Sequence, residues 1–175
     1  MARRIDHPGD RLEECWMMKA ETISTIKATA PVLKEHGQAI TQRMYEIAFD
    51  ARPDARQLFA TTWMVSSEEG RKQAGRLAGA VYAYAEHIDD LEKLAGAVEH
   101  IAQRHADTKV LPETYPVIGQ CLMAAIKDVL RDAATPEILG AWQEAYDALA
   151  DIFIQRERAI YKERNDALFP VKEAR

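Results

Sequence analysis

The segment EHIAQRHADTKVLPETYPVIGQCLMAAIKDVL, residues 99–130, contains the end of one predicted helix, a break, and the whole of the next helix. The first helix starts after Asp89 and Asp90, which can cap it, and ends close to His105. The second begins at Pro112, after the break DTKVLP. Apolar residues recur every three or four positions in both, which predicts helices that each bury one face. These positions are Leu91, Leu94, Val98 and Ile101, then Tyr115, Ile118, Leu122, Ala125, Ile126 and Val129.

The rest of the chain shows the same helical period and gives almost no support for strands. We therefore predict an all-α domain of six to eight helices with short links. The further helices that we predict are, in chain order, residues 21–36 closed by Gly37, residues 38–50, a short turn from Pro53 to Phe59, residues 66–87 with Ser66 and Glu69 as a capping box, and a long helix opened by Thr135 and Pro136.

Length and composition exclude several classes of protein. The chain has 175 residues and a net charge of −5, so no overall basic field would attract nucleic acid. It has no run of about 18 apolar residues that could span a membrane, and its start, MARRIDHPGD, lacks the apolar stretch of a secretory signal. Cys15 and Cys121 belong to no CxxC pair. We expect one cytoplasmic domain with free thiols.

Histidine is the residue type that best suggests chemistry, because no GxSxG, phosphate-loop, HExxH or GxGxxG pattern is present. His100 and His105 are five residues apart, about 140° around a helix, so they do not share a metal in the manner of an i, i+4 pair. A single imidazole suits a cofactor that brings its own equatorial donors, as haem does. From spacing alone, a surface or capping histidine remains the alternative at His105.

A resemblance to a known family favours a haem ligand over a surface or capping histidine at His105. Residues 99–130 resemble the proximal region of bacterial flavohaemoglobins and of single-domain bacterial haemoglobins of the Vitreoscilla type: Arg104 precedes His105, and Tyr115 follows ten residues later. Three further blocks resemble the same family in the same order, so that the resemblance covers roughly residues 20–162. These blocks are IKATAPVLKEHGQAITQRMYEIAFDARPDARQLF (26–59), QAGRLAGAVYAYAEHIDDL (73–91) and ILGAWQEAYDALADIFIQRERAIY (138–161).

The resemblance implies a globin fold around one haem b. The globin domain would span residues 19–165, between an N-terminal extension (1–18) and a C-terminal tail (166–175). On the proximal side, it implies His105 as the iron ligand, with Glu157 and Tyr115 as its hydrogen-bond partners. A carboxylate that accepts the second ring N–H would give the imidazole more anionic character. A solvent-facing Glu157 and a Tyr115 that only packs in the core are the alternatives.

On the distal side, the resemblance implies Tyr45 as the hydrogen-bond donor to a bound gas, with Gln73 as the second donor. Phe59 would pack against the porphyrin, and Leu77 would close an apolar roof one turn beyond Gln73. The loop ATTWMVS (60–66) differs in character from that of the family, so Gln73 could instead point to solvent, and Tyr45 could be plain core. The remaining residues expected at the cofactor are Arg104 and Ile118.

Reversible oxygen binding is the first function that this site predicts. Nitric oxide dioxygenation is the second, and it would need a separate reductase because the chain ends at residue 175, without room for the flavin and nicotinamide domains of the two-domain proteins. Peroxidase-like chemistry of His105, Glu157 and Tyr115 comes third. A gas sensor and a helical bundle without haem are the readings from other classes. A monomer or homodimer is expected.

Overall fold

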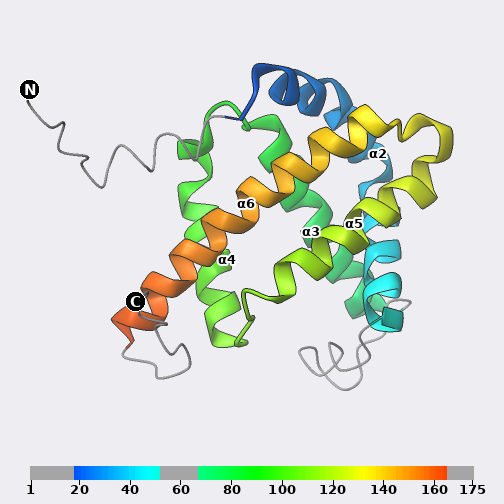
Figure 1. Cartoon of the computed structure of the whole chain (residues 1–175). Coiled ribbons are helices and arrows are strands. Elements are labelled where there is room, and N and C mark those ends of the chain that lie inside the picture. Colours follow the sequence, from blue (N-terminus) through cyan, green and yellow to red (C-terminus); the bar gives the residue numbers. More distant parts are fainter. Residues whose placement is uncertain (1–17, 52–66, 165–175) are drawn as a thin grey trace, which may run out of the picture.

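All regular structure in the described part of the chain, residues 18–51 and 67–164 of a computed structural model, is helical (Figure 1). This confirms the all-α prediction. Within these residues no helix is both long enough and apolar enough to cross a membrane. The elements are α2 (Ala20–Ala51), α3 (Glu68–Glu86), the short 3-10 helix η2 (Leu91–Leu94), α4 (Ala95–Asp107), α5 (Thr114–Leu130), the 3-10 helix η3 (Arg131–Ala133) and α6 (Pro136–Glu163).

The described residues form five α-helices, one fewer than the smallest number predicted, because α2 joins two predicted helices into one and the predicted turn after it is not among the described residues. The prediction that Gly37 ends a helix was wrong. Gly37 is buried inside α2, and a Cβ there would lie 3.2 Å from the Cβ of Ala78 on α3. Next to it, Thr41 donates to the carbonyl of Ala74 on α3 at 2.8 Å. The glycine therefore allows two helices to approach closely and does not terminate one.

Helix starts match the predicted signals only in part. The prediction that Asp89 and Asp90 cap the helix before His105 was wrong, because Leu91–Leu94 form the 3-10 helix η2, Asp90 precedes η2 without a side-chain capping bond, and α4 begins at Ala95.

Ser67, rather than Ser66, caps α3 by accepting a hydrogen bond from the N–H of Gly70 at 3.0 Å. Thr135 caps α6 as predicted, with Pro136 at the first helical position. The turn predicted from Pro53 to Phe59 lies outside the described residues.

The corner after α4 is closed by backbone hydrogen bonds. The N–H of Val110 donates to the carbonyl of His105 at 3.0 Å, and that of Lys109 donates to Ala106 at 3.2 Å. Lys109 has a φ of 57°, in the left-handed region that glycine adopts more easily. This corner fixes the last turn of α4 and brings the chain back into α5.

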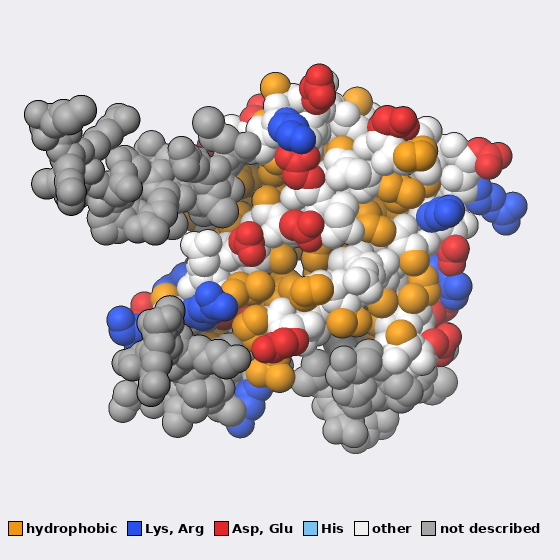
Figure 2. Space-filling model, in the orientation of Figure 1, with side chains coloured by type: hydrophobic (Ala, Val, Ile, Leu, Met, Phe, Trp, Pro, Cys, Tyr) orange, Lys and Arg blue, Asp and Glu red, His pale blue; other side chains and the backbone are white. Residues whose placement is uncertain are grey.

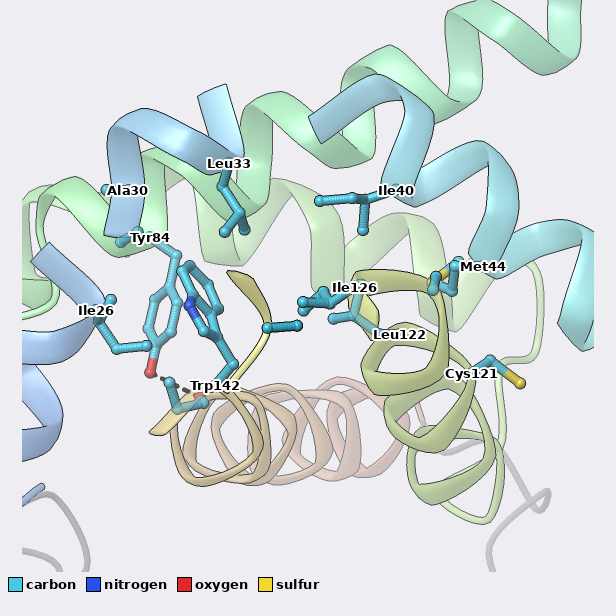
Figure 3. Close-up of a cluster of buried hydrophobic side chains, with 14 of the residues drawn as sticks. Ile26, Ala30, Leu33, Ile40, Met44, Tyr84, Cys121, Leu122, Ile126 and Trp142 are labelled. Carbon is cyan, nitrogen blue, oxygen red and sulfur yellow. Dashed lines mark hydrogen bonds between the residues drawn. The ribbon is translucent and has the colours of Figure 1, made fainter. Parts of the chain in front are cut away.

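Buried side chains fall into two clusters. The main cluster is built on α2, which packs against α3, α5 and α6, and Figure 3 shows Ile26 and Leu33 of α2 pointing toward Trp142 of α6. The second cluster lies where α6 crosses α4 and the start of α5, and among the described helices α4 packs mainly against α6. Its buried members are Ala102, Ala106, Tyr115, Ala150, Phe153, Ile160 and Tyr161.

The surface over α6 is not wholly polar. Hydrophobic side chains reach the surface in the middle of the face on which α6 lies, among acidic side chains along that helix (Figure 2). The partly buried residues that pack against the second cluster are Val98, Ile101, Val110, Tyr146, Leu149 and Ile154.

Candidate functional site

Three predicted site residues from three helices meet at the second cluster. His105 comes from the last turn of α4, Tyr115 from the first turn of α5, and Glu157 from α6. The Nδ1 atom of His105 lies 2.8 Å from Oε1 of Glu157 and 3.0 Å from the hydroxyl oxygen of Tyr115. Tyr115 donates to the same carboxylate oxygen at 2.5 Å. We call these three residues the proximal triad.

The proton arrangement of the proximal triad follows from the chemistry of its groups. An ionised carboxylate only accepts hydrogen bonds, so both Tyr115 and the Nδ1–H of His105 donate to Glu157. A neutral imidazole with its proton on Nδ1 has a lone pair on Nε2, the atom that can bind a metal. No described residue is hydrogen-bonded to Nε2, and the His105 side chain is 32% exposed.

Burial strengthens the carboxylate as an acceptor. Glu157 is 1% exposed, and among the described residues no group is hydrogen-bonded to its Oε2 atom. Its negative charge is therefore directed toward His105 and Tyr115. Burial, followed by the hydrogen bond to Glu157, raises the pKa of Tyr115 far above its usual value, so that the phenol remains a protonated donor.

Phe153 is a member of this site that the sequence analysis did not single out. Its ring centroid lies 5.5 Å from that of His105, and it stacks on Tyr115 at 6.5 Å. Phe153 precedes Glu157 by one helical turn of α6, so both side chains project from the same face. That spacing was the available signal. The ring limits how the imidazole can tilt.

On the other helices, Tyr45 of α2 and Gln73 of α3 are brought together. The side-chain amide of Gln73 donates to the hydroxyl oxygen of Tyr45 at 3.4 Å. Tyr45 is 6% exposed, its ring stacks on Phe49 at 5.9 Å, and burial raises the pKa of its hydroxyl. We call Tyr45 and Gln73 the distal pair. It joins α2 to α3 through one long hydrogen bond between neutral groups.

The other predicted site residues are placed less closely together. Leu77 lies one turn after Gln73 on α3, and Ile118 lies three residues after Tyr115 on α5; both are partly buried and pack against the main cluster. Arg104 is exposed on α4, where its carbonyl accepts from Thr108. Phe59 lies outside the described residues. Contact of these four residues with a cofactor remains a prediction.

The donor set fits a cofactor that carries its own metal ligands. No group of three or more His, Cys, Asp or Glu side chains within residues 18–51 and 67–164 could hold a bare metal ion. His105 instead offers one nitrogen, fixed on its other side by a buried carboxylate and set beside the aromatic ring of Phe153. A single fixed imidazole next to apolar side chains is one arrangement by which proteins hold a haem iron.

Comparison with known proteins supports the same interpretation. The sequence model of the globin family matches residues 42–153. A globin-like protein of Aquifex aeolicus, described as uncharacterized, is 46% identical over 147 residues, which make up 84% of this chain and 99% of the relative.

Longer proteins and solved structures are also similar. A flavohemoprotein of Halalkalibacterium halodurans is 43% identical over 150 residues, 86% of this chain, but the chain spans only 36% of that relative. The structure of an engineered carbene transferase, a candidate nitric oxide dioxygenase of Rhodothermus marinus, superposes with a TM-score of 0.78. It is 33% identical, and the match covers 86% of this chain and all of that one.

Proposed function

This chain belongs to the globin family, and from that premise we propose that it holds one haem b through Nε2 of His105 and binds oxygen reversibly beside Tyr45. The observation that carries the proposal is the proximal triad, in which Glu157 and Tyr115 engage Nδ1 and leave Nε2 as the ligand atom. His105 would hold the haem, which when bound would supply an iron that can bind a diatomic gas.

The proximal triad would set the electron donation of His105. Glu157 accepts a hydrogen bond from the Nδ1–H of His105 at 2.8 Å, which would give the imidazole anionic character and make it a stronger donor through Nε2. Tyr115 holds the carboxylate in place by donating to the same oxygen. Phe153 restricts the imidazole ring from the side.

The distal pair would influence which gas binds. In the hydrogen bond between them, Gln73 is the donor and the oxygen of Tyr45 is the acceptor. A hydroxyl donor in a buried place favours a ligand that gains negative charge, as oxygen does on haem. Gln73 then orients Tyr45 and serves as the second donor.

Nitric oxide dioxygenation is the second candidate, favoured by the likeness to flavohemoproteins and to the Rhodothermus marinus protein. Turnover would consume electrons, so this activity includes an electron-donating protein as a proposed partner. Because the chain spans about a third of the flavohemoproteins that it matches, their whole activity does not transfer to it directly. A cytoplasmic monomer or homodimer is the state that we propose for either function.

One experiment separates the two candidates. The haem-loaded protein is reduced and cycled between oxygen and argon while its absorption spectrum is recorded, and the oxygenated form is then mixed with nitric oxide by stopped flow. Reversible cycling supports oxygen binding, and stoichiometric nitrate that becomes catalytic with an added reductase supports dioxygenation. A spectrum that does not respond to oxygen would contradict the first candidate.

A further inference from the structure

We propose that Thr41 is a positioning residue for the distal pair, because it fixes α3 against α2 at the turn that carries Gln73. The inference rests on the proposed role of Tyr45 as a donor to a bound gas. Thr41 lies on α2 one helical turn before Tyr45, and Ala74 directly follows Gln73 on α3. The hydroxyl of Thr41 donates to the carbonyl oxygen of Ala74 at 2.8 Å. This bond joins the two helices that carry the distal pair.

The hydroxyl of Thr41 has three acceptors within reach, and the shortest bond is the one between helices. Within α2, the carbonyl oxygens of Gly37 and Gln38 lie 3.0 and 3.1 Å from Oγ1, and such oxygens are the usual partners of a threonine inside a helix. A hydroxyl carries one hydrogen, so the three oxygens compete for it. Thr41 is 2% exposed, and its bond to Ala74 lies in the interior. A buried bond between helices resists movement of α3 along α2.

Gly37 brings the two helices close enough for this short side chain to reach across. It lies one turn before Thr41, and a Cβ there would be 3.2 Å from the Cβ of Ala78. Ala78 lies one turn after Ala74, so the two contacts are successive steps of one antiparallel crossing, in which residue numbers rise on α2 as they fall on α3. The next turn of α2 carries Tyr45. Gly37 therefore sets the spacing of the helices, and Thr41 fixes their register just before the distal pair.

The distal pair depends on that register because its hydrogen bond is long. The amide nitrogen of Gln73 lies 3.4 Å from the hydroxyl oxygen of Tyr45, so a small movement of α3 away from α2 would break the bond. Such a movement would also change how both side chains face a bound gas. Oxygen gains negative charge on binding and would lose stabilisation from a displaced donor, whereas carbon monoxide gains little charge and would lose little. Thr41 thus determines selectivity between the two gases through Gln73 and Tyr45.

The test compares Thr41→Val, which keeps the shape of the side chain but removes the hydroxyl, with Thr22→Val in the full-length protein. Thr22 is the matched control, because it is also a buried threonine of α2 whose hydroxyl donates to another helix, to Glu144 of α6 at 2.7 Å. It lies roughly six turns of α2 before Tyr45. Loss of its hydroxyl therefore removes a comparable bond away from the distal pair.

The first readout does not require haem: the side-chain amide resonances of Gln73 in the NMR spectrum, recorded in the ferrous carbon monoxide state where haem is present. We expect them to move in Thr41→Val, as in Tyr45→Phe, and to stay in place in Thr22→Val. Thr41→Ser keeps the hydroxyl and should restore the resonances of the parent. If Thr41→Val does not fold, Thr41→Ala takes its place, because it adds no methyl group against the Ala74 carbonyl.

The second readout reports on gas binding. We expect oxygen to leave Thr41→Val about five-fold faster than it leaves the parent, since a distal hydrogen bond is weakened. Carbon monoxide should leave at a rate that changes by less than about two-fold, and its stretching frequency should rise because the distal donor is displaced. Thr22→Val should lose stability and keep the rates and the frequency of the parent.

Unchanged Gln73 resonances or an unchanged oxygen rate in Thr41→Val, equal changes in Thr22→Val, or no recovery in Thr41→Ser would overturn the inference. Failure of the parent to take up haem would overturn the proposed function, and the Gln73 resonances alone would then decide the positioning role.

Discussion

The hydrogen bonds on the two sides of the site differ in number and in length. On the His105 side, side chains from three helices share hydrogen bonds of 2.5, 2.8 and 3.0 Å around a buried carboxylate. On the Tyr45 side, two neutral side chains share one bond of 3.4 Å. Bonds to a charged group are roughly twice as strong as those between neutral groups. The proximal side should therefore contribute to stability, and the distal side should mainly affect ligand binding.

Removing the shared carboxylate should have the largest effect on stability. Glu157→Ala leaves the Nδ1–H of His105 and the hydroxyl of Tyr115 without their acceptor and opens a cavity, so we expect a loss of about 3 kcal/mol in the free energy of unfolding. Urea denaturation measures it. The control is Glu163→Ala on the same helix, where an exposed pair with Arg156 should change stability by less than about 0.5 kcal/mol. Equal losses in the two variants would show that the buried carboxylate stabilises the fold no more than an exposed one.

Tyr115→Phe removes one arm of the proximal triad and keeps the ring that stacks on Phe153. The hydroxyl donates to a charged, buried acceptor, so we expect a loss of about 2 kcal/mol in the free energy of unfolding. Urea denaturation checks the value. A loss below that of Tyr45→Phe would show that the triad is no stronger than the distal pair.

Tyr45→Phe should show the opposite balance. Losing the hydroxyl removes the long bond from Gln73, which joins two neutral groups, and we expect stability to change by less than about 1 kcal/mol. If Tyr45 donates to the gas, oxygen should leave Tyr45→Phe about ten-fold faster than it leaves the parent. A ten-fold change corresponds to about 1.4 kcal/mol, which is the contribution of one hydrogen bond. Flash photolysis or stopped-flow displacement measures the rate. Unchanged release with reduced stability would make Tyr45 a core residue.

Lys109→Gly tests the contribution of the corner after α4 to the stability of the proximal side, because it should remove backbone strain there. Lys109 has a φ of 57°, which costs a residue with a side chain more than it costs glycine. After the greater entropy of glycine in the unfolded chain is subtracted, we expect a gain of about 0.5 kcal/mol. Thermal and urea denaturation measure it. A destabilised variant would mean that the side chain of Lys109 makes a contribution larger than the strain.

The smallest effect concerns the exposed pair between α4 and α6. Arg156 donates to both oxygens of Glu99, at 2.5 and 3.0 Å, and lowers the pKa of Glu99 to about 2. A pKa that is lower in the folded state contributes stability above the unfolded pKa of about 4.3, and this contribution is lost as the pH falls toward 2. Parent and Glu99→Gln should therefore differ slightly in denaturation midpoint at pH 7 and converge near pH 2. A difference that grows in acid would contradict this.

Periodicity predicted the all-α fold because it reports which residues lie on one face of a helix. It could not separate two uses of glycine: Gly37 carries the same signal whether it ends a helix or lets α2 approach Ala78. The start of α3 at Ser67 instead of Ser66 reflects two adjacent serines with equal capping ability.

The site was predictable only in part, because local spacing does not record contacts between residues that are far apart in the sequence. Spacing placed His105 at a helix end, and the family resemblance named Tyr115 and Glu157, which the structure brings together. The hydroxyl of Thr41 donates to a carbonyl 33 residues away, and no local pattern records such a contact. Tertiary packing decides it.

The most direct test of the central claim, that His105 is the haem ligand, is the absorption spectrum of His105→Gly with and without added imidazole. We predict that the parent shows a Soret band that shifts reversibly with oxygen, that the variant loses this response or its haem, and that imidazole restores it by occupying the vacated space. A parent that takes up no haem, or a variant whose spectrum matches the parent without imidazole, would contradict the account.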